Sequence, residues 1–431
     1  MSVETGFAGL AVLMLLLVLR LPVAMALIAV SFGGVASMAG LRPALGLLSN
    51  TPYSFVASWT MSAVPMFLLM GFVAFHTGLT TGLFEAAKVL LRKLPGGLAV
   101  SAIFACSGFA AVSGSSLACA AAMGRIAIPE MVRAGYRPSL AAGCIAAGGT
   151  IGALIPPSIL MIIYGIFAET SITQVFIGGI GVGLATALGY SIVIMLISWQ
   201  RPDLIPDRDD SPADWTALLR IAPVVALVAV VFGGLFSGLF TATEAGAVGA
   251  LATIVIAAAM GTLTRQALFQ SLVETVTTSG SLFIIGVGAV MFTRFLSLSG
   301  LSGFLSSFVA DQDLSYWHLM AIIVVIYLVL GTFMEPFGAM LVTLPIFLPI
   351  LRQEGISLVW FGVLVVKMLE IGMITPPVGL NVFVIRNVAS QYVTTAQIFL
   401  GILPFFISDM IVVLVVVAFP ALVLWLPSIA G

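Results

Sequence analysis

Apolar runs of about twenty residues recur along the chain, and this pattern constrains the fold more than any other feature of the sequence. A helix needs about 20 apolar residues to cross the hydrocarbon core of a bilayer. The pattern predicts spans at residues 6–19, 22–39, 61–78, 138–168, 173–199, 221–240, 244–262, 276–298, 357–388 and 399–426. Two further apolar stretches, 97–128 and 317–350, are interrupted by polar, Gly and Pro residues.

The scarcity of charge supports a polytopic membrane protein. Charged residues make up 8% of the 431 residues and hydrophobic residues 61%, whereas a soluble domain carries about 25% charged residues. So few charges cannot cover a surface that faces water, and a surface that faces lipid needs none. The net charge of -1 and the lack of a basic block in the sequence give no sign of nucleic-acid binding. The three cysteines lie in apolar runs and are expected to be packing residues.

The distribution of Lys and Arg predicts how the chain is threaded. If the N-terminus lies outside, twelve basic residues fall inside and only Arg42 and Arg352 fall outside. That bias follows the positive-inside rule, but only if each interrupted stretch enters and leaves on the same side. The sequence therefore predicts two re-entrant hairpins, at about 97–128 and 317–350. The hydrophilic segment 201–220 is expected to be a cytoplasmic linker.

The two halves of the chain share a pattern. GGTIGALIPPSILMIIYGI at 148–166 aligns on its proline pair with LEIGMITPPVGLNVFVI at 369–385. Each motif follows an interrupted hairpin and a short amphipathic arm, near 80–95 and 300–314. The threading gives the halves opposite orientations, so we expect an all-α protein of two inverted repeats, 1–200 and 221–431. Inverted repeats with broken helices at matching positions indicate a midplane binding site in secondary transporters.

The paired prolines predict two broken helices, at about 138–168 and 357–388. Each proline lacks a backbone donor and blocks the carbonyl one turn back, so Pro156-Pro157 and Pro376-Pro377 should unwind their helices. Unsatisfied backbone in hydrocarbon costs several kcal/mol per group, so each break should line a cavity or contact an ion. Freed carbonyl oxygens are suitable ligands for Na⁺. The nearby side chains that can complete such a shell are Thr150, Ser158, Thr375 and Asn381.

Polar residues mark the tips of both hairpins. The first tip is Ser113-Gly114-Ser115-Ser116, where glycine permits a tight turn; a small-residue packing seam is the other interpretation of these residues. The second tip, residues 331–338, contains Glu335 at membrane depth. An intramembrane carboxylate is functional by default. Glu335 could hold a proton, but we expect it to coordinate a cation or to orient the tip backbone, with a structural hydrogen bond to the backbone as the alternative.

Three other charged residues have more local interpretations. Lys367 and Glu370 are spaced i, i+3 and are expected to form a mutually satisfied pair, with anion binding by Lys367 as the alternative. Glu244 follows Thr241 at a predicted helix N-terminus, the pattern of an N-cap with a first-turn carboxylate. The sequence contains no Walker A motif and no HExxH motif, so we expect no enzyme.

These motifs resemble a known family. SGSSLACAAAMGRIAIPEM (113–131), IAAGGTIGALIPPSILMIIYGI (145–166), FTATEAGAVGA (240–250), MEPFGAMLVTLPIFLPI (334–350) and WFGVLVVKMLEIGMITPPVGLNVFVI (360–385) are similar to the large membrane subunit of tripartite ATP-independent periplasmic (TRAP) transporters. The resemblance covers essentially the whole chain. Two residues depart from the family pattern, because Glu335 stands where Asp is frequent and Lys367 where an uncharged polar residue is expected.

The resemblance implies an elevator fold with a scaffold, a mobile transport domain and at least two Na⁺ sites as coupling-ion sites. One Na⁺ would lie between residues 113–116 and 152–158, and a second between 331–338 and 373–381, with the substrate between them. The Na⁺ residues implied are Ser113, Gly114, Gly149, Gly152, Gly331, Met334, Glu335, Met373, Thr375 and Pro376. The substrate-binding residues implied are Ser115, Ser116, Pro157, Ser158, Gly338, Pro377 and Asn381.

The resemblance also implies partners and a task. Such systems combine a large subunit, a small four-helix membrane subunit and a periplasmic substrate-binding protein in the bacterial inner membrane. The implied task is Na⁺-driven import of a small carboxylate handed over by the binding protein. The alternatives are a self-sufficient Na⁺/organic-anion symporter or exchanger of similar fold, and a membrane-embedded enzyme.

Overall fold

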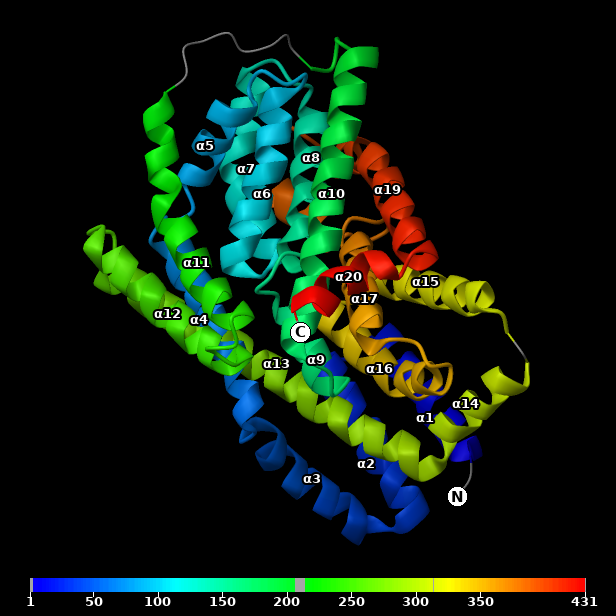
Figure 1. Cartoon of the computed structure of the whole chain (residues 1–431). Coiled ribbons are helices and arrows are strands. Elements are labelled where there is room, and N and C mark those ends of the chain that lie inside the picture. The colour runs from blue at the N-terminus through cyan, green and yellow to red at the C-terminus, as the bar shows by residue number, and fades with distance from the viewer. Residues whose placement is uncertain (1–2, 206–213, 313, 431) are drawn as a thin grey trace.

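A computed structural model describes residues 3–205, 214–312 and 314–430, and every regular element in these ranges is a helix (Figure 1). The first half contains α1 (Val3–Val18), α2 (Val23–Ala39), α3 (Leu41–Val56), η1 (Trp59–Ser62), α4 (Ala63–His76), α5 (Gly82–Leu91), α6 (Gly97–Ser113), α7 (Ser116–Arg133), α8 (Pro138–Thr150), η2 (Ile151–Ala153), α9 (Ile159–Phe167) and α10 (Ile172–Gln200). The second half contains η3 (Trp215–Ile221), α11 (Ala222–Phe236), α12 (Ala242–Ala259), α13 (Arg265–Ser299), α14 (Leu301–Asp311), α15 (Tyr316–Phe333), α16 (Pro336–Gln353), α17 (Leu358–Gly372), α18 (Leu380–Val388), α19 (Thr395–Ala418) and α20 (Ala421–Ala430).

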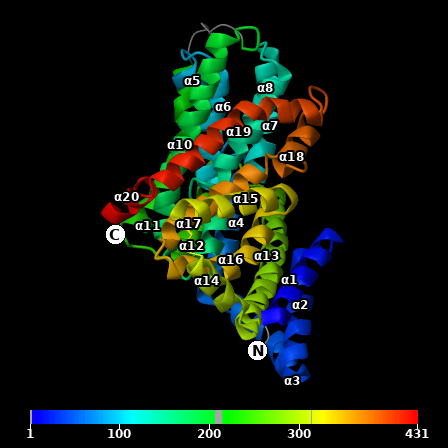
Figure 2. The same ribbon diagram turned by 90° about the vertical axis from the view of Figure 1, so that its right-hand side faces the viewer.

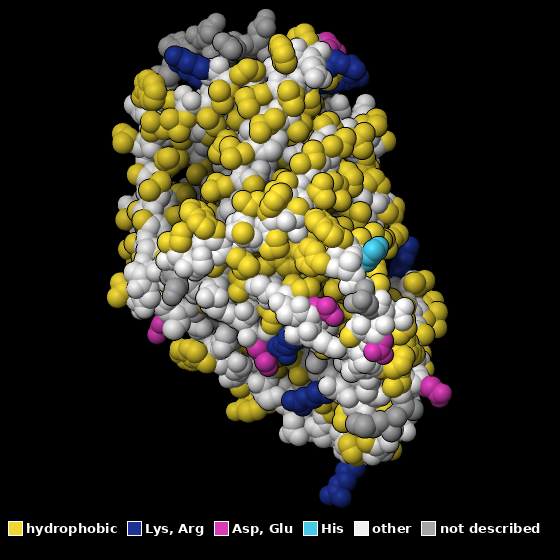
Figure 3. All heavy atoms as spheres, turned by 45° about the vertical axis from the view of Figure 1, so that its right-hand side comes forward, with side chains coloured by type: hydrophobic (Ala, Val, Ile, Leu, Met, Phe, Trp, Pro, Cys, Tyr) yellow, Lys and Arg dark blue, Asp and Glu magenta, His cyan; other side chains and the backbone are white. Residues whose placement is uncertain are grey.

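The described helices suit a bilayer in length and composition. Eight of them, counted within the described ranges, are long and apolar enough to cross a membrane. Hydrophobic side chains cover the broad middle of the face drawn in Figure 3, while Lys and Arg side chains appear at its upper end and on its lower part. A wide apolar band between charged ends is the surface expected of a multi-pass membrane protein.

The repeat predicted from the proline pairs is present in the helices. Both bounds of α16 (Pro336–Gln353) lie 220 residues after the bounds of α7 (Ser116–Arg133). Helices α15 and α6 end 220 residues apart as well, at Phe333 and Ser113. The second helix of the hairpin therefore has the same length in both halves, 18 residues.

The two hairpins lie in different parts of the molecule. Helices α5, α6 and α7 lie in the upper part in Figure 1, whereas α15, α16 and α14 lie below them, from the middle of the molecule downward, and the turned view agrees (Figure 2). The chain turns between the two helices of each hairpin at residues 114–115 and 334–335. This placement agrees with the inverted arrangement that the charge distribution predicts, and the orientation of each half in the membrane stays a prediction.

Three helices differ from the prediction. Residues 41–56 form α3, which was not predicted because Arg42, Asn50 and Pro52 interrupt its apolar run. Helix α13 begins at Arg265 rather than near 276, since Thr264 caps it through a hydrogen bond from the Ala267 amide (3.1 Å). The span predicted at 399–426 is present but ends earlier, at Ala418. The predicted range divides into α19 and α20 at Pro420, which cannot donate a helical hydrogen bond.

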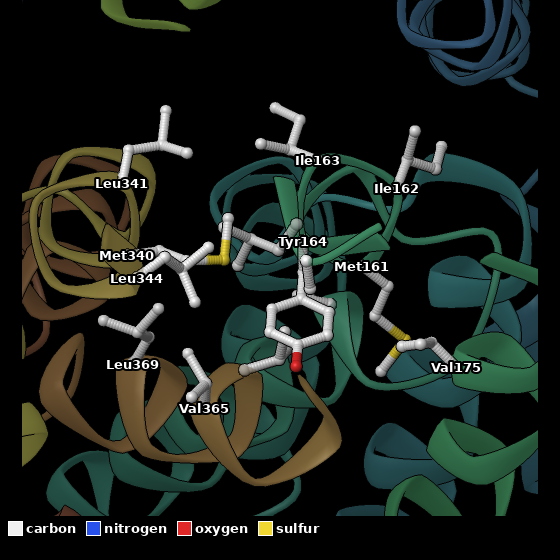
Figure 4. Close-up of a cluster of buried hydrophobic side chains, with 14 of the residues drawn as sticks. Met161, Ile162, Ile163, Tyr164, Val175, Met340, Leu341, Leu344, Val365 and Leu369 are labelled. Atoms are coloured by element: carbon white, nitrogen blue, oxygen red, sulfur yellow. The ribbon is translucent and has the colours of Figure 1, made fainter. Parts of the chain in front are cut away.

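The apolar core joins the two repeats. Helix α9 from the first half packs against α16 and α17 from the second half, with Tyr164 at the centre of the cluster (Figure 4). The Tyr164 hydroxyl donates to the Leu358 carbonyl at 2.6 Å. The outer part of the first broken helix is thereby fixed to the second repeat.

Candidate translocation site

The first hairpin tip is shaped by one glycine and one serine. Helix α6 ends at Ser113, and Gly114 adopts a left-handed conformation (φ 61°) that favours glycine. Ser115 then caps α7, since its side chain accepts a hydrogen bond from the Ala118 amide at 3.4 Å. The chain reverses direction within two residues and leaves short polar side chains at the tip.

The first broken helix unwinds where the proline pair predicts it. Helix α8 ends at Thr150, one turn of 3₁₀ helix follows, and residues 154–158 are not helical. The Pro156-Pro157 peptide bond is cis. Ser158 restarts the helix by accepting a hydrogen bond from the Met161 amide (3.4 Å). The break is therefore a defined interruption of the helix, and the helix that follows it has its own N-cap.

The first tip lies directly against the first break. A Cβ added to Gly114 would lie 2.2 Å from the Pro157 carbonyl oxygen, and one added to Gly152 would lie 2.9 Å from the Ser115 carbonyl oxygen. Only glycine allows these two backbones to come so close. Backbone carbonyl and serine oxygens therefore gather where tip and break meet, which is a donor set suited to a hard cation.

The second tip meets the second break in the same way. A Cβ added to Gly372 would lie 2.5 Å from the Cα atom of Gly331. Beyond the cis Pro376-Pro377 bond, Gly379 adopts φ 62° and α18 begins. The backbone N–H of Asn381 donates to the Met373 carbonyl at 3.0 Å. This hydrogen bond spans the break and holds its two ends together.

A cavity of about 580 Å³ lies beside the tips. The first tip lines it together with Glu335, Glu370 and Met373. Its other wall comes from α4 and α13, where Glu274, Thr277, Thr278 and Ser281 follow one face of the helix at i, i+3, i+4 and i+7. A volume of this size is typical of a pocket for a small molecule.

Three buried oxygen atoms near the tips have no hydrogen-bond partner among the described residues. They are Ser113 Oγ at the first tip, Glu370 Oε2 before the second break and Asn381 Oδ1 after it. Buried polar groups normally have a partner. Oxygen atoms left without one, beside carbonyls that converge from two backbones, fit a site for a hard monovalent cation such as Na⁺.

The structure brings some of the predicted site residues to the cavity and places others behind it. Of the predicted residues, the cavity is lined by Ser113, Gly114, Ser115, Ser116, Glu335 and Met373. Gly149, Gly152, Pro157 and Ser158 pack behind the first tip, and Gly331 packs behind the second tip, against Gly372. Thr375, in the second break, donates to the Ile371 carbonyl of the preceding helix α17 (2.6 Å). Met334 is half-buried at the end of α15, and Pro376 and Pro377 are exposed.

Two predicted residues have neighbours that the sequence did not indicate. Gly338 faces α2, where a Cβ would meet the Val23 side chain at 3.1 Å, and it does not line the cavity. Asn381 is fully buried, and its side-chain nitrogen donates to the Ala146 carbonyl at 3.3 Å. Asn381 therefore connects the second break to the helix before the first break.

The predicted Lys367–Glu370 pair is wrong. Lys367 instead donates to Asp409 Oδ1 at 2.5 Å, and Glu370 accepts a hydrogen bond from the Ser116 hydroxyl at 2.7 Å. The long lysine side chain reaches α19, while the glutamate points to the first tip. Asp409 was missed, although a lone carboxylate within an apolar run requires a counter-charge and Lys367 was available to supply it.

The wall on α13 was also missed. Glu274 Oε1 lies 3.1 Å from His76 Nε2 at the end of α4, so these two side chains approach each other between α4 and α13. The helical spacing of Glu274 and the three hydroxyl residues after it could have predicted a polar face. The Thr241–Glu244 prediction is confirmed, because the two residues form a capping box at the start of α12.

Two matching hairpins, broken helices in contact with their tips and a largely apolar cavity that carboxylate and hydroxyl groups line in part together define an inverted-repeat membrane transport protein. Comparison with known families gives the particular class. Residues 10–422 match the family model described as the tripartite ATP-independent periplasmic transporter, DctM component. The chain belongs to this family and is a TRAP transporter large permease subunit rather than an enzyme, as the sequence motifs indicated.

Several curated relatives are similar over most of their length. The chain is 35% identical over 379 residues to the C4-dicarboxylate TRAP transporter large permease protein DctM of Pseudomonas aeruginosa, covering 86% of this chain and 87% of that protein. It is 31% identical to the sialic acid TRAP transporter large permease protein SiaM of Vibrio cholerae, covering 87% of each. The isethionate TRAP transporter permease protein DctMQ of Oleidesulfovibrio alaskensis is 32% identical, over 95% of this chain and 64% of that protein.

Solved structures support the fold alone. The Alcanivorax borkumensis YdaH transporter superimposes with a TM-score of 0.63 at 14% identity, over 89% of each chain. The Neisseria gonorrhoeae antimetabolite efflux pump MtrF gives a TM-score of 0.62 at 14% identity, over 89% of this chain and 85% of that protein. Both are transporters with the same helical architecture.

Proposed function

We propose that this chain is the substrate-translocating subunit of a Na⁺-coupled secondary transporter in the bacterial inner membrane. It imports a small organic acid that a periplasmic binding protein delivers, and it works beside a small four-helix membrane subunit. TRAP large permeases work with these two partners in general. The names of the relatives point to C4-dicarboxylates, sialic acid and isethionate, which are all organic acids.

The charge of the cavity is the observation that carries the proposed coupling. Its described lining includes Glu274, Glu335 and Glu370 and contains no Lys or Arg. At a separation of about 6 Å and an effective dielectric constant of about 20, each carboxylate would repel an anionic substrate by about 3 kcal/mol. Cations that enter with an organic anion would offset the repulsion from each ionised carboxylate.

The two contacts between tip and break are the proposed cation sites. Residues 113–116 and 152–158 would hold one Na⁺, and residues 331–338 and 373–381 would hold the other. The unpartnered oxygens of Ser113 and Asn381 and the converging carbonyls support this assignment. The bound ions would supply positive charge next to the substrate, which the serines of the first tip would orient.

In the proposed motion, the part of the protein on one side of the cavity moves relative to the part on the other side. The tips and breaks contact each other closely on one side, whereas α4 and α13 form the opposite wall. We propose an elevator movement in which hairpins and broken helices travel as a unit along α4 and α13. Cargo and ions would move together because both are held by the moving part.

Uptake into proteoliposomes tests the proposal. Vesicles containing both membrane subunits receive the binding protein and a panel of labelled acids: a C4-dicarboxylate, sialic acid and isethionate. We expect accumulation of one of these acids under an inward Na⁺ gradient and its loss when Na⁺ is equal on both sides. Ser115→Ala and Pro376→Ala should reduce uptake in folded protein, whereas Gly46→Ala, in open space on α3, should not.

Two results would change the assignment. Accumulation that persists at equal Na⁺ on both sides removes the coupling. Na⁺-driven accumulation that needs neither the binding protein nor the small subunit would make the chain a self-sufficient symporter.

A further inference from the structure

A chain of hydrogen bonds connects the two breaks through the interior of the protein. Thr150 is the last residue of α8, immediately before the first break, and it contacts Tyr190 on α10. Tyr190 contacts Asp409 on α19, and Asp409 contacts Lys367 on α17, the helix that ends at the second break. We call these four residues the relay.

The direction of each hydrogen bond follows from the chemistry of the groups. Lys367 donates to Asp409 Oδ1 at 2.5 Å and to the Thr186 hydroxyl at 3.0 Å. A carboxylate only accepts, so the Tyr190 hydroxyl donates its proton to Asp409 Oδ2 at 2.7 Å. The Thr150 hydroxyl, 3.2 Å from the Tyr190 oxygen, then donates either to that oxygen or to the Ala147 carbonyl at 2.6 Å.

The relay is isolated from solvent. All four of its residues, and Thr186 beside them, have no exposed surface in the described structure. A buried polar group that loses its partner is costly, more so if it is charged. A shift of α8 that separates Thr150 from Tyr190 would therefore break a contact at a place where no water replaces it.

The relay occupies the place where the two repeats meet. Thr150 and Glu370 stand six residues before the first proline of their respective pairs. Thr186 and Asp409 stand fifteen residues after the N-caps Ser171 and Thr394 of α10 and α19. The Lys367 ammonium thus lies between equivalent positions of the two halves.

A second hydrogen bond connects α17 to the first hairpin tip. Glu370, one turn after Lys367 on α17, accepts a hydrogen bond from Ser116 of the first tip at 2.7 Å. The helix before the second break is therefore bonded both to the first tip and, through the relay, to the helix before the first break. Both elements that would hold the first cation are joined to the helix that leads to the second.

We propose that the relay couples the two cation sites, so that occupation of one break sets the backbone geometry of the other. The proposal rests on the Na⁺ sites of the proposed function. Tyr190 is a positioning residue in this scheme, since it touches neither ion nor cargo and acts through Thr150 and Asp409. Coupling of this kind appears as cooperativity in the Na⁺ dependence, with a Hill coefficient that can approach the number of sites.

The substitution Tyr190→Phe tests the relay. It keeps the ring, which packs edge-on against Phe405 at a centroid distance of 5.4 Å, and removes the bridging hydroxyl. Tyr164→Phe is the matched control, because Tyr164 is equally buried and its hydroxyl bonds to the Leu358 carbonyl, outside the relay. Initial uptake is measured against Na⁺ concentration at saturating substrate.

The Hill coefficient for Na⁺ should be about 2 in the unchanged protein and in the Tyr164→Phe variant. It should fall to about 1 in the Tyr190→Phe variant. The maximal rate of Tyr190→Phe at high Na⁺ should stay within about twofold, since the sites themselves are intact. Thr150→Val should reproduce the effect from the other end. The double variant should be no worse than either single one, because both break the same connection.

The outcomes separate the relay from the proposed function. A Hill coefficient in Tyr190→Phe equal to that of a cooperative unchanged protein overturns the relay alone. Uptake by the unchanged protein that ignores Na⁺ overturns the proposed function and the relay with it. If Tyr190→Phe does not transport, the same comparison is made on purified protein by the rise of Tm with Na⁺. There too, undiminished cooperativity overturns the relay.

Discussion

The contact between the second tip and the second break makes a sharp prediction at Gly372. An alanine methyl group at this position would lie 2.5 Å from both Cα and C of Gly331 and 2.7 Å from its carbonyl oxygen. All three atoms belong to the backbone, so no change of rotamer relieves the clash. Carbon atoms normally approach to about 3.5–4.0 Å, and the tip must therefore move away from the break by about 1 Å.

Two opposing effects set the size of the change in stability. Overpacking of a close contact costs about 1–3 kcal/mol. Replacing glycine by alanine at a helix position stabilises the folded state by about 0.5–1 kcal/mol, because less backbone entropy is lost on folding. We expect Gly372→Ala to lose about 1–2 kcal/mol in the free energy of unfolding, and to lose far more in transport, because a displacement of about 1 Å in a binding site can cost about a hundredfold in rate.

The assay compares Na⁺-driven uptake in proteoliposomes with thermal unfolding in detergent. Gly46→Ala is the control, since a Cβ there meets nothing within 4 Å and should leave the stability of the helix unchanged or raise it slightly. Gly372→Ala should fold, melt a few degrees lower and transport at about a hundredth of the normal rate. Normal uptake and normal Tm in Gly372→Ala would refute the close contact of tip and break.

Further predictions follow from single groups. Ser113→Ala removes an unpartnered oxygen at the first tip, so the Na⁺ concentration for half-maximal uptake should rise about tenfold with little change in Tm; an unaltered Na⁺ dependence would argue against a ligand role. Lys367→Met leaves Asp409 buried and unpaired, which should cost about 3–5 kcal/mol in unfolding free energy, while the double variant with Asp409→Asn should recover most of it; equal losses would contradict the pairing. Thr241→Ala removes a capping box and should cost about 1 kcal/mol without affecting Na⁺ dependence, which separate melting and uptake curves would check.

Much of the fold could be predicted because its rules are local. The length of an apolar run fixes a span, two adjacent prolines end a helix, and Gly114 with its serine neighbours permits a turn at membrane depth. The charge distribution then required both hairpins to return to the side they came from. These signals involve neighbouring residues or one bilayer thickness, so they predict the hairpin tips and the two breaks closely, although they miss α3 and the start of α13.

The features that the sequence did not predict depend on contacts between distant segments of the chain. Asp409 follows Lys367 by 42 residues, and no spacing rule connects them. Glu370 points to Ser116, 254 residues away, although its spacing from Lys367 suggested a local pair. The orientation of a long side chain inside a bundle is decided by the helix that packs against it, so only the assembled structure could assign these partners.

Flux of labelled sodium tests the central claim most directly. Vesicles with both membrane subunits and the binding protein receive the transported acid and ²²Na⁺, with the membrane potential clamped. The account predicts that ²²Na⁺ enters with the acid in a fixed ratio greater than one, and that Ser113→Ala lowers both fluxes together at limiting Na⁺. Accumulation of the acid with no entry of ²²Na⁺ would contradict it.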